Sequence, residues 1–479
     1  MTTAGARSMG ATRPAYLRGA GLGLGLGLLM VTSAVAQTPP RPVEPNTRVP
    51  AGIVRYAPSG FPDRIVASPA QDAATGFAVA WRSDAAVQAP ALEVVIAGDS
   101  PDMGMPRQVR ASTRALRTEN GLAHHHRADV DGLQPDTLYA YRVQGDRTFS
   151  AWMHLRTAAA PGTPLVLLYF GDSQNKNVSL TSRVMQTALR AAPNARLALH
   201  AGDLVSGGDG EDDNEWGEWF ESGGALPSIL ATAPAPGNHE YFEEHEDTPR
   251  ERRVLGLPWQ LQFALPNNGA PEAPHTTYWF DYQGVRVAVV DGTSALDLDT
   301  AAAQARWLDT VLAANPHPWS IVLMHQPIYS PRAGRDNAAL QAHLLPVLLA
   351  RQVDLVLQGH DHLYGRRGAA RAAGGATVAT PQFVVSVAGA KQYRLSAEAR
   401  AGMRPVAEDT QLFQVIRLDD RRLRYEARTA TGRLYDAFEL VADAAGAKRL
   451  VEHDAGRIAE RECPRVHTTL KGRADRCWE

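Results

Sequence analysis

The sequence predicts two successive folds, a small all-β sandwich followed by a larger α/β domain of layered sheets and helices. Residues 61–158 carry short, partly alternating apolar segments separated by turn residues, among them TGFAVAWRS, ALEVVIAG and TLYAYRVQG. In residues 163–442, apolar strands such as LVLLYF and VRVAVVDG alternate with helix-like segments such as SLTSRVMQTALRAA. The first pattern is typical of a β sandwich, and the second of an α/β domain.

The N-terminal residues have the features of a secretory signal peptide. Three arginines precede the apolar stretch GAGLGLGLGLLMVTSAVA, which ends in the small residues Ala34-Val35-Ala36. Its apolar run of about 16 residues is shorter than the ~20 that a transmembrane helix needs. We therefore expect residues 1–36 to be a signal peptide and residues 37–60 a Pro-rich linker. The protein should be periplasmic or secreted, with no stable membrane anchor.

The two cysteines, Cys463 and Cys477, both lie in the C-terminal segment 443–479. Export to an oxidising compartment would allow them to form a disulfide, and the alternative is a pair of free thiols. In the chain-entropy model, closing a loop of about 15 residues is worth roughly 3 kcal/mol. Because this segment follows every motif described below, we expect loss of the bond to leave the function almost unchanged.

The overall charge is balanced, with 49 Lys and Arg against 51 Asp and Glu. A balanced chain has no global field that attracts nucleic acid or an anionic membrane, so we expect neither as a partner. Any chemistry on phosphate groups must therefore come from a local site. The sequence makes no prediction of the oligomeric state.

Five polar clusters in the α/β region each follow an apolar strand. They hold Asp172 and Gln174 in GDSQ, Asp203 in GDL, Asn238 and His239 in GNHE, His325 in MHQP, and His360 and His362 in GHDH. One such cluster is a weak signal, but the carboxyl ends of neighbouring strands converge, so five in one order indicate a site. Carboxylates, an amide and imidazoles without thiolates suit two divalent ions such as Fe, Zn or Mn.

The motif order GD, GD, GNHE, H, GHxH resembles the calcineurin-like metallophosphoesterase superfamily. With the sandwich in front, the chain is similar to the purple acid phosphatases and their bacterial relatives, and LQPDTLYAYRVQ resembles a stretch of fibronectin type III domains. The resemblance implies a four-layer α/β/β/α catalytic domain preceded by a small fibronectin III-like β sandwich. It also implies hydrolysis of small phosphate monoesters by a hydroxide that bridges two divalent metal ions.

The same resemblance assigns a role to each motif residue. Asp203 would bridge the two ions. The other ligands divide between them, with Asp172 and His362 on one ion and Asn238, His325 and His360 on the second. His239 would not bind metal; it would face the substrate beside Asn238 and stabilise or protonate the leaving oxygen.

Two positions depart from the family pattern. Purple acid phosphatases place a tyrosine three residues after the bridging aspartate, where this chain has Ser206. Most other relatives have Asp-x-His in the first motif, where this chain has Asp172-x-Gln174. We expect the Gln174 amide oxygen to be a metal ligand, with an outer role through water as the alternative. A neutral amide in place of a phenolate favours two divalent ions over a pair that includes Fe(III).

Other residues leave alternatives open. Arg332, Arg335 and Arg366 flank motif residues and could hold a substrate phosphate, or they could be solvated surface arginines. The run HHH at 124–126 has no acidic partner at a useful spacing, so we expect a structural role rather than a metal site. The acidic stretch DGEDDNEWGEWF lacks the ligand spacing of an EF-hand and is interpreted as a loop and helix start.

Two rival functions remain at this stage. A phosphodiesterase would use the same chemistry on a different substrate. A partner-binding protein with a vestigial site belongs to another class, but such a site should have lost ligands or His239. Only one ligand is irregular here, the one that relatives supply as a tyrosine or a histidine and that Ser206 and Gln174 replace, so the sequence favours an enzyme.

Overall fold

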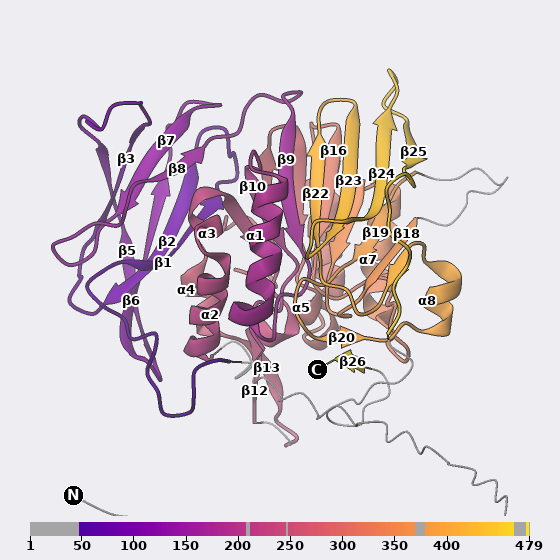
Figure 1. The fold of residues 1–479 in the computed structure, drawn as a ribbon, viewed down its shortest axis with the longest axis horizontal. Helices are drawn as coiled ribbons and strands as arrows, with labels where there is room; N and C mark the ends of the chain where they lie inside the picture. The colour runs from indigo at the N-terminus through magenta and orange to yellow at the C-terminus, as the bar shows by residue number, and fades with distance from the viewer. Residues whose placement is uncertain (1–46, 207–210, 246–247, 369–378, 464–475, 479) are drawn as a thin grey trace, which may run out of the picture. The chain divides into compact units, whose positions relative to one another are not determined.

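The first strands of the chain form two antiparallel sheets, β1-β2-β6-β5 and β4-β3-β7-β8 (Figure 1). Their bounds are β1 (Asp63–Pro69), β2 (Phe77–Asp84), β3 (Ala91–Ile96), β4 (Arg107–Arg110), β5 (Ser112–Thr118), β6 (Gly121–Val130), β7 (Leu138–Val143) and β8 (Met153–Arg156). Alternate residues of β2, among them Phe77, Val79 and Trp81, pack against Leu92 and Tyr141 from the second sheet. This shared core makes the predicted β sandwich.

The computed structural model describes residues 47–206, 211–245, 248–368, 379–463 and 476–478. After the sandwich, these residues build two seven-stranded sheets. The first has the order β11-β10-β9-β22-β23-β24-β25, and the second β14-β15-β16-β17-β19-β18-β21. Strands β9, β10 and β11 run parallel, as do β15, β16, β17 and β19.

The strands of the first sheet are β9 (Leu165–Phe170), β10 (Leu197–His200), β11 (Ala231–Pro234), β22 (Leu412–Leu418), β23 (Arg422–Thr429), β24 (Leu434–Ala442) and β25 (Lys448–Glu452). Those of the second are β14 (Tyr278–Tyr282), β15 (Val285–Val289), β16 (Trp319–Leu323), β17 (Leu355–Gln358), β18 (Tyr364–Gly368), β19 (Gln382–Val385) and β21 (Val406–Ala407). Two short pairs stand apart, β12 (Tyr241–Glu244) with β13 (Arg252–Leu255), and β20 (Gln392–Tyr393) with β26 (Arg476–Trp478).

Helices accompany these strands as the sequence predicts for an α/β domain. They are η1 (Asn177–Thr181), α1 (Ser182–Ala191), α2 (Asp213–Gly223), α3 (Leu226–Ile229), η3 (Asn238–Glu240), α4 (Leu257–Gln262), α5 (Gly292–Asp297), α6 (Ala301–Ala313), α7 (Ala338–Ala350) and α8 (Ala397–Gly402). The apolar segment SILATA (residues 228–233) has the composition of a strand, but in the structure it ends α3 and begins β11. The reason is Pro227, which occupies the first turn of α3 and favours a helix start.

The alternation of side chains along β9 shows how the layers form. Leu165, Leu167 and Tyr169 lie in the core between the two sheets. The intervening residues, among them Leu168 and Phe170, face the opposite way and pack against α1. On the far side, the outer face of the second sheet packs against α5, α6 and α7. Helices therefore cover both outer faces, and the predicted four-layer α/β/β/α arrangement is confirmed.

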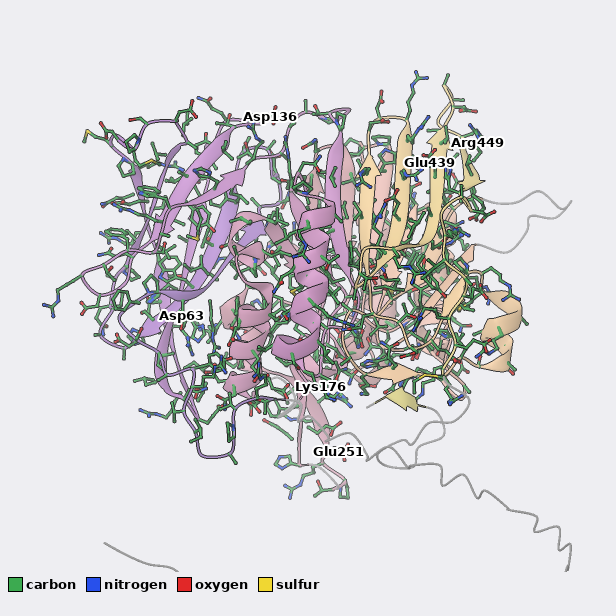
Figure 2. The ribbon with its side chains drawn as sticks, in the orientation of Figure 1. Asp63, Asp136, Lys176, Glu251, Glu439 and Arg449 are labelled. Atoms are coloured by element: carbon green, nitrogen blue, oxygen red, sulfur yellow. A yellow bond between two sulfur atoms is a disulfide. The ribbon has the colours of Figure 1, made fainter. Side chains whose placement is uncertain are left out.

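A buried ionic cluster holds the sandwich to the first turn of α2. Asp213 is 2 % exposed and accepts hydrogen bonds from Arg64 and Arg82, which lie on β1 and β2. Asn120 donates to the same carboxylate at 3.0 Å, and Arg82 is also paired with Asp63 at 2.6 Å. The acidic stretch that the sequence places at a helix start therefore joins the two folds. Figure 2 labels Asp63 on the sandwich side.

The ends of the chain contribute more than the sequence predicts. The described part of the linker, residues 47–60, contacts α2, where the Thr47 hydroxyl donates to Glu218 and the Tyr56 hydroxyl to Glu221. In the C-terminal segment, β25 is an edge strand of the first large sheet, and Cys463 and Cys477 form the predicted disulfide. The predicted signal peptide, residues 1–36, lies outside the described residues. Within the ranges described above, no helix combines the length and apolar composition that a membrane span requires.

Candidate metal centre

The two aspartates of the GD motifs lie at the ends of adjacent parallel strands. Asp172 follows β9 and Asp203 follows β10, and both are almost completely buried, at 0 % and 1 % exposed. Lys176, a few residues beyond Asp172, marks this lower edge of the sheet in Figure 2. Because the carboxyl ends of β9 and β10 meet here, the two carboxylates share one site, as the motif order predicts.

Two motif positions must be glycine because a carboxylate oxygen approaches each of them closely. A Cβ added to Gly359 would lie 2.1 Å from the Asp172 Oδ1 atom, and one added to Gly237 would lie 2.2 Å from the Asp203 Oδ1 atom. Any larger residue would push the carboxylates out of place. The glycines of GHDH and GNHE therefore let the loops of the site close around the two aspartates.

The protein fixes the orientation of the His325 ring. Its Nδ1–H donates to the Ala201 carbonyl at 2.6 Å, so in its neutral form the ring presents the lone pair of Nε2 to the site. That Nε2 lies 3.1 Å from Asp203 Oδ2, 3.3 Å from Asn238 Oδ1 and 3.0 Å from His360 Nδ1. A backbone hydrogen bond of this kind is typical of histidines that bind metal, because it fixes the tautomer.

The GHDH turn brings two further imidazoles to the site through strained backbone. His360 and His362 have φ of +71° and +38°, in the left-handed region that non-glycine residues rarely adopt. Asp203 is also left-handed, with φ +47°. Strain of this kind is found mainly at functional sites, where the surrounding structure holds it. His362 Nε2 lies 3.2 Å from Asp172 Oδ2.

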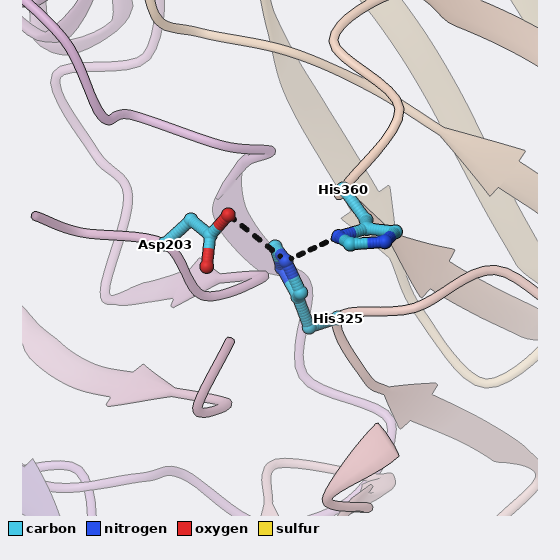
Figure 3. A group of neighbouring side chains, drawn as sticks. All are labelled: Asp203, His325 and His360. Atoms are coloured by element: carbon cyan, nitrogen blue, oxygen red, sulfur yellow. Dashed lines mark hydrogen bonds and ion pairs between the residues drawn. The ribbon is translucent and has the colours of Figure 1, made fainter. Parts of the chain in front are cut away.

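Two groups of side chains can each hold one ion, and they share Asp203. One group is Asp203, His325 and His360, drawn in Figure 3, where His325 lies between the other two. The other is Asp172, Asp203 and His362. Within each group the candidate ligand atoms lie within 4.8 Å of one another. A carboxylate shared by two such groups is the arrangement that a bridging ligand requires.

The short helix η3 supplies the GNHE residues. Asn238 directs its amide oxygen to His325, and the His239 backbone N–H donates to Asp203 Oδ1 at 3.0 Å. The Glu240 carboxylate accepts from the backbone N–H groups of Asp203 at 3.0 Å and Leu204 at 2.7 Å. Glu240 therefore supports the Asp203 loop, a role that the sequence analysis missed although the residue lies inside the motif.

Gln174 is buried beside both carboxylate groups. Its amide nitrogen donates to Asp203 Oδ2 at 2.6 Å and lies 3.2 Å from His362 Nε2. Its Oε1 atom is buried and has no hydrogen-bond partner among the described residues. A rotation of the amide by 180° exchanges these two atoms and would direct the oxygen to the position between Asp203 and His362. The residue is therefore placed where the expected ligand would be.

The pKa values show how unfavourable this buried site is without a cation. Burial raises the pKa of Asp172 to about 7, although His325 opposes the shift. Burial alone would lower the pKa of His325, but Asp203 and Asp172 raise it to about 9. The two buried carboxylates therefore favour positive charge beside them, which within the protein comes first from His325 and also from Lys391. The buried Oε1 of Gln174 and Nδ1 of His362, which have no hydrogen-bond partner in the described part of the chain, add unused metal-binding atoms. The donor set fits divalent ions.

The three predicted arginines have different environments. Arg335 is ion-paired with Asp361, the buried residue between His360 and His362. Arg332 lies over the ring of Tyr393, with its guanidinium carbon 4.4 Å from the ring centroid. Both therefore lie beside the GHDH turn.

The structure rules out the substrate-binding role that the sequence allowed for Arg366. It is 4 % exposed and is paired with Asp436 at 2.8 Å and with Glu452 at 2.7 Å. Arg366 and Tyr364 lie on the same face of β18, and both donate to Asp436. The strand therefore directs Arg366 into a buried ionic cluster, where it cannot hold a substrate phosphate.

The HHH run on β6 forms structural contacts. The two ring nitrogens of His126 lie 2.7 Å from the Ser83 hydroxyl and 2.9 Å from the Thr113 hydroxyl. The Nδ1 of His124 lies 2.7 Å from the Val87 carbonyl. Burial lowers the pKa of His125 to about 3, so this ring is neutral in the folded protein. These contacts agree with the expected structural role.

Two family models match the chain in succession. The model described as the purple acid phosphatase N-terminal domain matches residues 62–157, and the model described as calcineurin-like phosphoesterase matches residues 165–364. An uncharacterised protein of Mycobacterium tuberculosis is 28 % identical over 349 residues, which are 65 % of this chain and 63 % of the relative. Purple acid phosphatase 23 of Arabidopsis thaliana is 25 % identical over 293 residues, which are 54 % of this chain and 60 % of the relative. The chain thus spans about three fifths of the length of these relatives.

Solved structures share the fold. The purple acid phosphatase isolated from yellow lupin (Lupinus luteus) seeds aligns with a TM-score of 0.64 at 18 % identity, covering 81 % of this chain and 75 % of that one. PhoD aligns with a TM-score of 0.59 at 10 % identity, covering 84 % and 95 %. The two family models match in order, that of the purple acid phosphatase N-terminal domain over the sandwich and that of the calcineurin-like phosphoesterases over the strands that carry the candidate metal centre, so the chain is similar to both in the order in which the purple acid phosphatases combine them.

Proposed function

We propose that the protein is an exported phosphoesterase that hydrolyses small phosphate monoesters with two divalent ions. The sandwich would be residues 61–158, and the catalytic domain residues 163–442. The observation that carries the proposal is that two groups able to hold an ion share Asp203. Purple acid phosphatases are a family of dimetal enzymes, and the strand-end residues of this chain follow their motif order.

The proposed ligands follow from the two groups. Asp203 would bridge the ions; Asp172, His362 and Gln174 would hold the first; and Asn238, His325 and His360 would hold the second. Two bound divalent ions would supply a water of lowered pKa and would neutralise charge on the phosphoryl oxygens. The fixed tautomer of His325 would present Nε2 to its ion without rearrangement.

His239 would be the catalytic acid. Its backbone N–H is fixed to Asp203, so the residue is held beside the bridging position, and its side chain is half-buried and does not belong to either ion-holding group. From there its imidazolium would donate a proton to the leaving oxygen as the P–O bond breaks. A positioned general acid typically contributes 10²–10⁴-fold to the rate.

Asn238, His239, Arg332 and Arg335 would together bind the substrate phosphate. The pair formed by Arg335 with the buried Asp361 ties its guanidinium to the turn that carries His360 and His362. A monoester phosphate carries two negative charges near neutral pH, whereas a diester carries one. Arginines beside two divalent ions therefore favour the monoester over the diester.

Export is supported by the disulfide between Cys463 and Cys477. Disulfides persist in the periplasm and outside the cell, and they are rare in the cytosol of mesophiles. We therefore place the protein in the periplasm or among secreted proteins.

The proposal is tested on one protein sample with two chromogenic substrates and a metal analysis. We expect two ions per chain and faster hydrolysis of the monoester. Faster hydrolysis of the diester would indicate that the protein is a phosphodiesterase. A protein with no ions that remains inactive after metal is added would contradict the enzyme and would support a binding protein.

A further inference from the structure

The C-terminal disulfide contacts Tyr393, which in turn contacts the proposed metal ligand His362, although the two cysteines are far from every motif in the sequence. Cys477 belongs to β26, which pairs antiparallel with β20. Cys463 Sγ lies 4.0 Å from the Tyr393 carbonyl of β20, and the Cys463 backbone N–H donates to the buried Glu408 at 2.7 Å. The disulfide thus attaches β26 to β20 and to the buried residues that support β20.

Tyr393 of β20 connects this pair of strands to a proposed metal ligand. Its backbone N–H donates to the His362 carbonyl at 3.0 Å. Its ring meets the His362 imidazole edge to face, with 4.9 Å between the ring centroids. His362 has a left-handed backbone, so both contacts restrain a conformation that the chain would otherwise leave.

We propose that Tyr393 is a positioning residue for His362 and that the Cys463–Cys477 disulfide keeps it in place. The inference rests on the proposed metal-binding role of His362. It reverses the expectation that the disulfide is unimportant for the site, because the tail returns to the centre through β26. Reduction of the disulfide should lower the affinity for the ion that Asp172 and His362 would hold.

The length of β26 explains why a covalent link is needed. The strand has only three residues and pairs with only two in β20. A pair this short is not stable by itself in water. Without the disulfide, β26 should separate from β20, and the backbone of Tyr393 would lose its strand partner.

The test measures metal affinity directly, by titrating metal-free protein with Zn²⁺ or Mn²⁺ against a chelating indicator. Tyr393→Ala removes the ring and should lower the affinity for one of the two ions by about 10- to 100-fold. Changes that misorient a metal-binding histidine typically have effects of this size. Tyr393→Phe keeps the ring and should bind both ions with parental affinity. The double variant Cys463→Ser/Cys477→Ser should lower the affinity for the same ion as Tyr393→Ala. Excess metal should restore the binding of both ions in either variant.

Two further measurements make the coupling specific. A phosphine reductant should weaken that ion in the parent protein and leave the double cysteine variant unchanged. Adding Tyr393→Ala to the cysteine variant should lower the metal affinity by less than the two separate effects combined, because both changes act through one contact. Leu92→Ala, in the fully buried core of the sandwich, is the control for general destabilisation and should keep both affinities.

The outcomes separate this inference from the proposed function. If His362→Ala keeps both ions, the metal-binding role of His362 is wrong and the inference falls with it. If His362→Ala loses an ion while Tyr393→Ala and the cysteine variant bind both normally, the inference alone is wrong. Equal weakening in Leu92→Ala would also overturn it, because the effect would then be general destabilisation.

Discussion

The buried cluster at the start of α2 predicts a large and specific loss of stability. Asp213→Ala removes the carboxylate that neutralises Arg64 and Arg82, whose exposed fractions are 8 % and 1 %. Arg82 keeps its pair with Asp63, but Arg64 has no other carboxylate within ion-pair distance in the described part of the chain. Removing one partner of a buried pair typically costs 3–5 kcal/mol, because the remaining charge stays buried and uncompensated.

This loss is measurable by urea unfolding followed through the fluorescence of Trp216 and Trp219, which lie in the same helix. With an m-value of about 3 kcal/mol/M, a loss of ~3–5 kcal/mol lowers the midpoint by about 1 M or more. Asp213→Asn preserves the shape and one hydrogen-bond acceptor, so it should fall between the parent and the alanine variant. An unchanged midpoint in Asp213→Ala would refute the reasoning, and parental stability of Asp213→Asn would show that the charge is not needed.

Four further predictions concern individual residues. His239→Ala should lower kcat by about 10²–10⁴-fold with both ions still bound; loss of an ion from this variant would make His239 a ligand instead of an acid. Gln174→Ala should weaken one ion more than the other while Gln174→His retains both, and parental affinity in the alanine variant would indicate that Gln174 acts only through water. Because Ser206 replaces the family's tyrosine, the isolated protein should lack a purple tyrosinate-to-iron absorption, and a purple sample would contradict a divalent pair. Burial lowers the pKa of His200 to about 3, whereas an unfolded histidine has a pKa of about 6.5. The unfolded chain therefore binds an extra proton below pH 6.5, and stability should fall by roughly 2 kcal/mol from this group between pH 7 and pH 5. In urea unfolding of His200→Phe, the free energy of unfolding should differ less between pH 7 and pH 5 than in the parent protein. An equal difference in both proteins would reject this role of His200.

The place of the candidate metal centre in the fold could be predicted because its residues follow the ends of strands. An apolar run such as LVLLYF predicts a buried strand, and the polar residues after it must lie at the edge where parallel strands end. Asp172 and Asp203 illustrate this, since each lies within three residues of the end of its strand in the structure. The assignment of Asp203 as the shared residue came from the resemblance alone, and the two overlapping groups now give it a geometric basis.

Other features depend on contacts that the sequence does not show. The sequence left open whether Arg366, which flanks the GHDH motif, holds a substrate phosphate or is a solvated arginine, but the alternation along β18 directs it to Asp436 in a buried cluster. Tyr393 lies in no motif, and its contact with His362 depends on a tail segment that returns from far along the chain. The roles of Asp361 and Glu240 were missed for a different reason: buried acids inside metal motifs look like ligands or spacers until their hydrogen bonds are known.

The central claim is that two ions bind at one site through Asp203. It is tested most directly by titrating metal-free protein with Zn²⁺ or Mn²⁺ while the bound ions are counted and hydrolysis of a chromogenic phosphate monoester is followed. We expect activity to reach its maximum at two ions per chain, and we expect Asp203→Ala, shown to be folded by circular dichroism, to lose both the second ion and the activity. Full activity with one ion, or an Asp203→Ala protein that still binds two ions and hydrolyses the substrate, would contradict it.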